Sequence, residues 1–217
     1  QVSMLEDVMA AQGYLDASQM MSAFQLMRSN DLVWSRMIEG YLLGEDAPPA
    51  NDLMSWNADT TRMPARMHAE YLRHMFLQND LASGRYRVDG RPVSLRDIRV
   101  PVFAVGTETD HIAPWRSVYK IHGLSHAGVT FALTNGGHNA GVVSEPGHPR
   151  RHHRLHHTGD GDPAMGPDAW LEVAARHEGS WWPSWAAWLA ERSGAPVAPP
   201  APAPALAAAP GTYVLEA

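Results

Sequence analysis

Apolar residues recur at helical spacing along residues 1–82, with polar turns between the runs. Side chains three and four positions apart share one face of a helix, so this pattern predicts a series of helices. Shorter helical patterns end at Gly13 and begin after Asp31, and the strongest follows Pro64, which suits a first helical turn. The apolar positions of this strongest helix are Met67, Tyr71, Met75 and Phe76. We expect such methionine-rich positions to pack in a core, or alternatively to line a movable cap over an apolar substrate.

The pattern changes after residue 82, where short apolar runs and turn signals predict strands. Asp89-Gly90 lies between two short alternating segments, which favours a β-hairpin. The runs 100–105 and 129–133 each predict a buried strand, and residues 114–125 between them suit a helix. Strand, helix and strand in this order predict a parallel βα unit.

Two further helices and an Ala/Pro-rich tail are expected towards the C-terminal end. A helical pattern starts near Pro167, and the segment SWWPSWAAWLAERSG predicts a second helix that Gly194 ends. The tryptophans that this helix places on one stripe are Trp181, Trp185 and Trp188. Residues 195–210 are mainly alanine and proline, a composition that favours an extended tail.

Composition and charge exclude several function classes. The chain has 17 Lys and Arg against 23 Asp and Glu, so its net charge is −6, which argues against a nucleic-acid partner. It contains no cysteine, which excludes disulfides, thiolate metal sites and a cysteine nucleophile within these residues. No apolar run approaches about 18 residues, so we expect no transmembrane segment.

The segment GHPRRHHRLHH is rich in histidine and arginine. Its histidines are His148, His152, His153, His156 and His157. Paired histidines can bind zinc or nickel, but the interleaved arginines would repel a dication and no carboxylate joins the cluster. We therefore interpret the segment as solvated basic surface and expect no metal site.

Two candidate catalytic residues follow the predicted strands. Asp110 comes shortly after the strand 100–105, and His138 follows the strand 129–133 across two glycines. Ligands and catalytic groups in open α/β sheets lie beyond the carboxyl ends of the strands. A carboxylate can orient an imidazole, which titrates near neutrality, so the pair suits catalysis of the α/β-hydrolase type. Alternatively, Asp110 caps the helix that begins near Pro114, and His138 is a loop residue.

A nucleophile does not follow from the residues in the same way. The segment Gly123–Ala127 comes nearest to the nucleophile-elbow pattern G-x-S-x-G, but alanine replaces its second glycine. Its serine, Ser125, lies between Asp110 and His138 at an expected helix end, whereas the nucleophile should precede both on a strand-to-helix turn. We therefore expect the nucleophile to lie outside this chain.

Several longer blocks resemble, in the right order, the C-terminal half of the polyhydroxyalkanoate (poly-3-hydroxybutyrate) synthases. They are RSNDLVWSRMIEGYLLGE, DLMSWNADTTRMPARMHAEYLRHMFLQNDL, VPVFAVGTETDHIAPW, GGHNAGVV and GSWWPSWAAWL. They cover about residues 4–192 and are most similar to the single-subunit, class I enzymes. The resemblance implies an α/β class and the C-terminal part of an α/β-hydrolase fold. Residues 1–82 would form a helical cap or lid, residues 83–194 the last parallel strands and helices of the core, and residues 195–217 an Ala/Pro-rich tail.

The resemblance also implies an activity and a set of site residues. The family polymerises (R)-3-hydroxyacyl-CoA and releases CoA, with a cysteine in a G-x-C-x-G box, a histidine and an aspartate. By motif, Asp110 and His138 match the catalytic aspartate and histidine. The residues that match substrate-binding positions or fall in substrate-path blocks are His111, Trp56, Arg28, Tyr71 and Asn79.

Partners and location follow from the same resemblance. The expected partners are 3-hydroxyacyl-CoA, the growing polyester chain and the N-terminal half of the enzyme, with a homodimer at full length. No cofactor is expected, because CoA is the leaving group of the substrate, and the expected location is cytoplasmic, at the surface of polyhydroxyalkanoate granules. The nucleophilic cysteine would precede Gln1, so we expect this chain to be a fragment that is inactive alone.

Two departures and two alternatives stay open. Asn139 replaces the isoleucine of many family members, and residues 146–166 differ from the familiar pattern, which leaves room for an altered choice of substrate. One alternative is an esterase or polyester depolymerase on the same scaffold. A serine in place of the cysteine in the nucleophile elbow would favour this alternative. The other is a non-catalytic, granule-associated binding protein, which would release no CoA.

Overall fold

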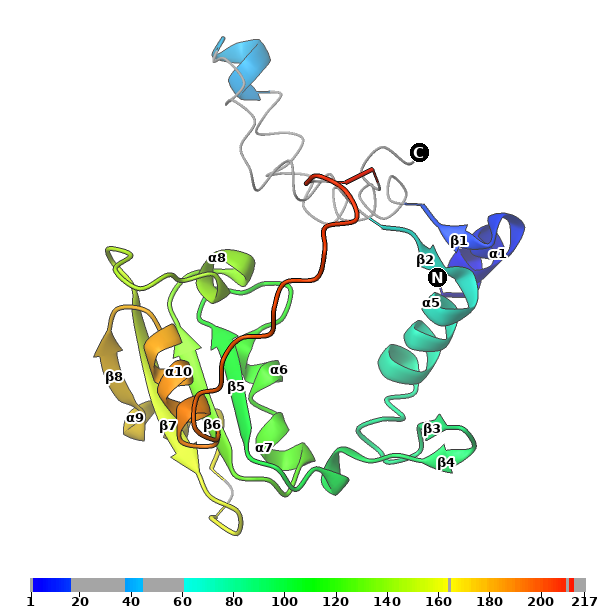
Figure 1. The fold of residues 1–217 in the computed structure, drawn as a ribbon. Helices are drawn as coiled ribbons and strands as arrows, with labels where there is room; N and C mark the ends of the chain where they lie inside the picture. The colour runs from blue at the N-terminus through cyan, green and yellow to red at the C-terminus, as the bar shows by residue number, and fades with distance from the viewer. Residues whose placement is uncertain (1, 17–37, 45–60, 164, 210, 213–217) are drawn as a thin grey trace. The chain divides into compact units, whose positions relative to one another are not determined.

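The computed structural model describes residues 2–16, 38–44, 61–163, 165–209 and 211–212 (Figure 1). The chain divides into two compact units. One comprises residues 1–100 with 122–127, and the other comprises residues 101–121 with 128–217. Each unit is described by itself.

The second unit is built on a four-stranded mixed sheet with the order β5-β6-β7-β8, which Figure 1 shows side by side from green to gold. The strands are β5 (Val102–Thr107), β6 (Val129–Thr134), β7 (His152–Thr158) and β8 (Ala175–Glu178). Strands β5 and β6 pair in parallel, so the predicted parallel pair is confirmed, although β5 starts at residue 102 instead of 100. The pairs β6–β7 and β7–β8 are antiparallel, which the sequence pattern did not predict.

The interpretation of the histidine- and arginine-rich segment as solvated surface is wrong. Residues 152–158 form β7, an inner strand between β6 and β8. Successive residues of a strand point to opposite faces, so only every second side chain has to be buried. His153 is buried, and its ring nitrogens lie 3.2 Å from the Gly179 carbonyl oxygen and 3.1 Å from Ser184 Oγ. Because its buried side chain is polar and is held by such contacts, the hydrophobic periodicity of the sequence does not show the strand.

One face of this sheet carries an aromatic core. Two short helices, α6 (Trp115–Val118) and α7 (Ile121–Leu124), form where one helix was expected over residues 114–125. Helix α9 (Pro167–Val173) follows later in the chain. The buried members of the core are Tyr119, Val129, Phe131, Leu133, Trp170 and Ala174. Trp170 lies edge to face with Phe131 at 5.2 Å between ring centroids. The helix predicted from Pro167 is confirmed, with the proline in its first turn.

Helix α10 (Trp182–Ala190) lies on the opposite face. Phe103 points away from the aromatic core, since its neighbours on β5 pack into that core. Its ring lies 6.1 Å from Trp181 and 5.6 Å from Trp188. Trp185 is 42% exposed, so the predicted tryptophan stripe is buried only in part. Residues 195–209 contain neither helix nor strand and are exposed.

The described residues of the first unit form short helices and two small antiparallel sheets of two strands each. Its elements are α1 (Val2–Gln12), β1 (Tyr14–Leu15), π-helix η2 (Ile38–Leu42), β2 (Met63–Pro64), α5 (Ala65–Tyr71), π-helix η3 (Leu72–Leu77), β3 (Arg87–Val88), β4 (Arg91–Pro92) and the 3-10 helix η4 (Leu95–Asp97). The helix after Pro64 is confirmed. So is the hairpin, because β3 and β4 pair around Asp89 and Gly90, which both have positive φ. Of the helix expected after Asp31, residues 32–37 lie outside the described residues and Ile38–Leu42 form η2.

The expected apolar face of α5 and η3 is not buried within this chain. Met67, Tyr71 and Phe76 are exposed, the last by 67%. The helical period therefore predicts the helix correctly, while the expected core packing of this face is wrong for these three side chains. Within the described ranges, no helix is both long and apolar enough to cross a bilayer.

Candidate active site

Asp110 lies in a tight turn directly after β5. Its Oδ1 accepts hydrogen bonds from the backbone N–H groups of Ile112 (2.8 Å) and Ala113 (2.9 Å). The hydroxyl of Thr107, near the end of β5, donates to Oδ2 at 3.3 Å. The alternative that Asp110 caps α6 is wrong, because Pro114 occupies the N-cap position and no side chain bonds there. Asp110 instead organises the turn that follows the strand.

His138 is the first residue of α8 (His138–Val142), a five-residue helix that begins shortly after β6. Its Nδ1 lies 3.0 and 3.2 Å from the two carboxylate oxygens of Asp110. The loop alternative for His138 is therefore wrong, and the two candidate catalytic residues meet as expected. The Asp110 side chain is 7% exposed and that of His138 is 47% exposed. The carboxylate is thus enclosed, whereas the imidazole stays open to a reacting group.

The hydrogen bonds keep Asp110 ionised at neutral pH. Burial alone would raise the pKa of this carboxyl group. The N–H donor of Ala113, the ring of His138 and the N–H donor of Ile112 together outweigh burial and lower the pKa to about 2. An ionised carboxylate at Nδ1 holds the imidazole tautomer that carries its proton there. Nε2 is then left to accept a proton, which is the role of a general base.

Close packing of α8 against β5 brings the two residues together. A Cβ atom at Gly141 would lie 2.5 Å from Thr107 Cγ2, so glycine permits this approach. The first helical hydrogen bond of α8 runs from Gly141 N to the Gly137 oxygen at 2.8 Å. Thr107 is buried, and it contacts both Asp110 and α8. Sequence reasoning missed both Thr107 and Gly141; the glycine three positions after His138 was the available signal.

Replacement of Gly141 by alanine is expected to lower the free energy of unfolding by about 1–3 kcal/mol, because overpacking forces α8 away from Thr107. Chemical denaturation measures the loss. Gly194→Ala is the matched control, since a Cβ there meets nothing within 4 Å. Adding Thr107→Ser to the Gly141 variant removes the clashing methyl group and should restore part of the stability. A Gly141 variant as stable as the control would contradict this packing role.

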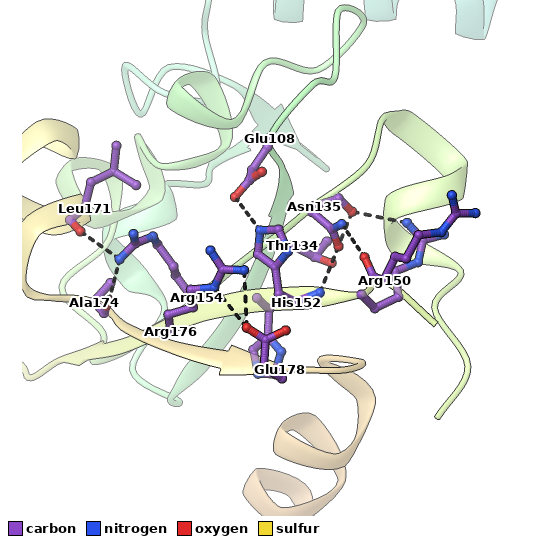
Figure 2. A network of polar contacts seen from close by, with 12 residues as sticks. Glu108, Thr134, Asn135, Arg150, His152, Arg154, Leu171, Ala174, Arg176 and Glu178 are labelled. Atoms are coloured by element: carbon purple, nitrogen blue, oxygen red, sulfur yellow. Dashed lines mark hydrogen bonds and ion pairs between the residues drawn. The ribbon is translucent and has the colours of Figure 1, made fainter. Parts of the chain in front are cut away.

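A polar network joins the loop after β6 to the start of β7 (Figure 2). The Asn135 side chain accepts from the N–H of His152 at 3.0 Å and donates to the Arg150 carbonyl at 2.9 Å. The Asn135 backbone N–H also donates to the His152 carbonyl at 3.1 Å. Nearby, Glu108 lies 3.6 Å from the His152 ring. Asn135 therefore fixes the loop that leads to His138, a role that only the fold reveals.

The other expected site residues fall in three places. His111 is exposed and lies beside Asp110 in the same turn. Tyr71 and Asn79 belong to the first unit, and Asn79 adopts a φ of 52° just after η3, a conformation that asparagine tolerates at helix ends. Trp56 and Arg28 lie outside the described residues. The substrate-binding roles of all five stay predictions.

The described part of the chain contains no group of three or more His, Asp or Glu side chains arranged to hold a metal ion. The strand β7 separates the histidines of the basic segment onto opposite faces of the sheet. Ser125, the rejected nucleophile, follows α7 directly, at a helix end as expected.

The fold is that of an α/β protein in which an aspartate and a histidine beyond the ends of two parallel strands are in contact. Comparison with curated proteins then gives the particular relatives. The chain is 42% identical over 219 residues to the poly(3-hydroxyalkanoate) polymerase of Methylorubrum extorquens, covering 99% of this chain and 35% of the relative. It is 41% identical over 221 residues to the poly(3-hydroxyalkanoate) polymerase subunit PhaC of Rhizobium etli, covering 100% of this chain and 34% of the relative.

The Cupriavidus necator subunit PhaC matches at 41% identity over 199 residues, covering 89% of this chain and 33% of the relative. No protein-family model matches the chain. The chain thus spans about a third of the length of the curated relatives it matches. Along essentially its whole length it is a homologue of poly(3-hydroxyalkanoate) polymerases, which confirms the resemblance that the sequence blocks indicated.

Proposed function

We propose that this chain is the C-terminal portion of a polyhydroxyalkanoate synthase, the portion that supplies the catalytic histidine and aspartate. The enzyme would be an acyltransferase that polymerises (R)-3-hydroxyacyl-CoA and releases CoA. The observation that carries the proposal is the contact between His138 Nδ1 and the Asp110 carboxylate, 3.0 Å long, in a homologue of the polymerases. An imidazole that a carboxylate holds in this way can act as the general base that activates a nucleophile.

An α/β-hydrolase core is part of the proposal. The order of Asp then His after adjacent parallel strands, with helices on both faces of the sheet, supports it. All six residues of β6 are buried, whereas only the last two of β5 are. Strand β5 also lies at an edge of the described sheet, where an earlier strand of the whole enzyme would pair. Residues 1–82 would serve as the cap, residues 83–194 as the end of the core, and residues 195–217 as a tail.

The proposed chemistry begins with a cysteine outside this chain. His138 Nε2 takes the thiol proton, and the thiolate sulfur bonds to the thioester carbonyl carbon. The bond from that carbon to the CoA sulfur breaks, and CoA leaves with the proton that His138 returns. Asp110 stays ionised and stabilises the transient imidazolium, or helps to deprotonate the 3-hydroxyl group of the next unit. The thioester is already activated, so the proposed reaction calls for no cofactor.

Substrate contacts, assembly and location belong to the same proposal and rest on the resemblance. His111, Trp56, Arg28, Tyr71 and Asn79 would contact the substrate or its path. The whole enzyme would act as a homodimer at the surface of cytoplasmic polyester granules. The net charge of −6 argues against nucleic acid as a further partner.

A graft tests the proposal. This chain replaces the homologous third of the Methylorubrum extorquens polymerase, and thiol release from 3-hydroxybutyryl-CoA is measured. We expect the graft to release CoA and form polymer, while the chain alone and the relative without its homologous third release none. A folded graft that releases no CoA would overturn the proposal. Ester hydrolysis without polymer would favour a hydrolase instead.

A further inference from the structure

The helix that carries His138 is too short to hold its own position. Helix α8 has five residues, and isolated helices much longer than this are marginal in water. Its placement therefore depends on what binds it from outside. Side chains from two later segments bind the carbonyl oxygens in and around α8.

Arg151, just before β7, binds carbonyl oxygens on both sides of His138. Its Nη2 donates to the Ala140 oxygen at 2.5 Å, and its Nη1 donates to the Asn135 oxygen at 3.4 Å. A Cβ atom at Gly136, which has a φ of +100°, would lie 2.8 Å from this Nη1. The glycine thus leaves room for the guanidinium. The Arg151 carbonyl in turn accepts from the N–H of Gly179 at 2.7 Å, which ties it to the second segment.

The second segment holds the other end of α8. The indole N–H groups of Trp181 and Trp182 both donate to the oxygen of Val142, the last helical residue, at 3.1 and 3.0 Å. The hydroxyl of Ser180 donates to the Ser144 oxygen just beyond. Ser180 and Trp181 are themselves buried, so this end is firmly anchored. We call Arg151, Ser180, Trp181 and Trp182 the α8 clamp.

We propose that the α8 clamp positions His138 for the reaction, with Arg151 and Trp182 as positioning residues that touch neither substrate nor reacting atoms. This inference rests on the proposed function. The physical argument is geometric, because the clamp binds carbonyl oxygens before, within and after the helix that His138 begins. A shift of about 1 Å in a catalytic group can cost about 10²-fold in rate. The clamp keeps Nδ1 against the Asp110 carboxylate and Nε2 towards the thiol.

The chain offers matched controls for both kinds of clamp residue. Arg154 likewise donates to two carbonyl oxygens, those of Leu171 (3.2 Å) and Ala174 (3.0 Å) at the end of α9, outside the His138 loop (Figure 2). Trp188 is a tryptophan of α10 whose buried indole N–H has no partner among the described residues. Arg151→Met is therefore compared with Arg154→Met, and Trp182→Phe with Trp188→Phe. Arg151→Lys tests rescue by a residue that keeps one charged donor group.

Two measurements are made on each variant. Nitrogen chemical shifts of the His138 ring, recorded on the chain itself, report the tautomer that Asp110 holds. The kcat and KM for CoA release are measured in the graft. An Asp110→Asn chain supplies the spectrum of an imidazole that has lost its carboxylate.

We expect Arg151→Met and Trp182→Phe to move the His138 spectrum towards that of Asp110→Asn. In the graft they should lower kcat roughly 10- to 10²-fold with little change in KM. Arg151→Lys should recover part of both, and the two controls should alter neither, even where they lower stability. Clamp variants that keep the wild-type His138 spectrum overturn the inference, whatever the activity of the graft. A graft without activity in which the spectra change as expected counts against the proposed function alone.

Discussion

His138→Ala is expected to lower CoA release by the graft by about 10⁴-fold or more. In the proposed mechanism the imidazole is the general base for the thiol, and alanine leaves no group at this position to accept the thiol proton. Initial rates of thiol release measure the loss. His148→Ala is the control, because His148 lies outside the contact between Asp110 and His138 and bonds the Pro149 carbonyl. A His138→Ala graft that folds and keeps more than a tenth of the rate would contradict the assigned role.

Asp110→Asn separates the catalytic role of the carboxylate charge from the structural role of the side chain in the turn. The amide keeps the size of the side chain and can still accept from the N–H groups of Ile112 and Ala113, so the turn should survive. It presents no negative charge to Nδ1, and the loss of a triad carboxylate costs about 10⁴-fold when the wrong tautomer forms. Because the pKa of Asp110 is about 2, its charge does not change at working pH. We therefore expect the roughly 10⁴-fold loss in the rate of CoA release by the graft to persist from pH 6 to pH 9, measured as initial rates of thiol release.

The sequence predicted the part of the site that depends on local order along the chain. Asp110 and His138 each follow an apolar run, and parallel pairing of β5 and β6 brings the ends of those runs to one edge. Parallel pairing itself could be inferred because a helical segment separates the two strands. These steps need only the periodicity of the chain and the handed geometry of an α/β unit.

What holds the site together could not be predicted in the same way. Thr107 meets Gly141, Arg151 meets Ala140, and the indole of Trp182 meets Val142 forty positions earlier. Such contacts depend on where β7 and α10 return to the sheet. The strand β7 was itself missed, since its inward residue His153 is polar and is buried through hydrogen bonds. Hydrophobic periodicity does not detect a strand of that kind.

The apolar face of α5 and η3 shows a second limit of prediction from the sequence. Its spacing predicted a helix correctly, yet Tyr71 and Phe76 contact each other edge to face and remain exposed. A helical period shows which side chains share a face, and it does not show what covers that face. The substrate-binding roles of Arg28 and Trp56 likewise came from the resemblance alone and are testable only in the graft.

The largest expected loss of stability comes from Trp170→Ala, which should lower the free energy of unfolding by about 3–5 kcal/mol. Trp170 is fully buried at the centre of the aromatic core. Its ring centroid lies 5.2 Å from Phe131, 5.9 Å from Tyr119 and 6.3 Å from Trp115. Truncation removes all three contacts and leaves a cavity between α9 and the sheet.

Trp170→Phe tests whether the ring contacts, and not the indole N–H, carry this stability. The buried Nε1 of Trp170 has no hydrogen-bond partner among the described residues, so its removal loses no bond. A phenyl ring keeps an edge-to-face contact with Phe131. We therefore expect Trp170→Phe to cost less than half as much as Trp170→Ala in chemical denaturation of the chain. Trp185→Ala, at a position that is 42% exposed, is the control and should cost far less than Trp170→Ala. Equal losses for Trp170→Ala and Trp185→Ala would show that this aromatic core does not hold α9 on the sheet.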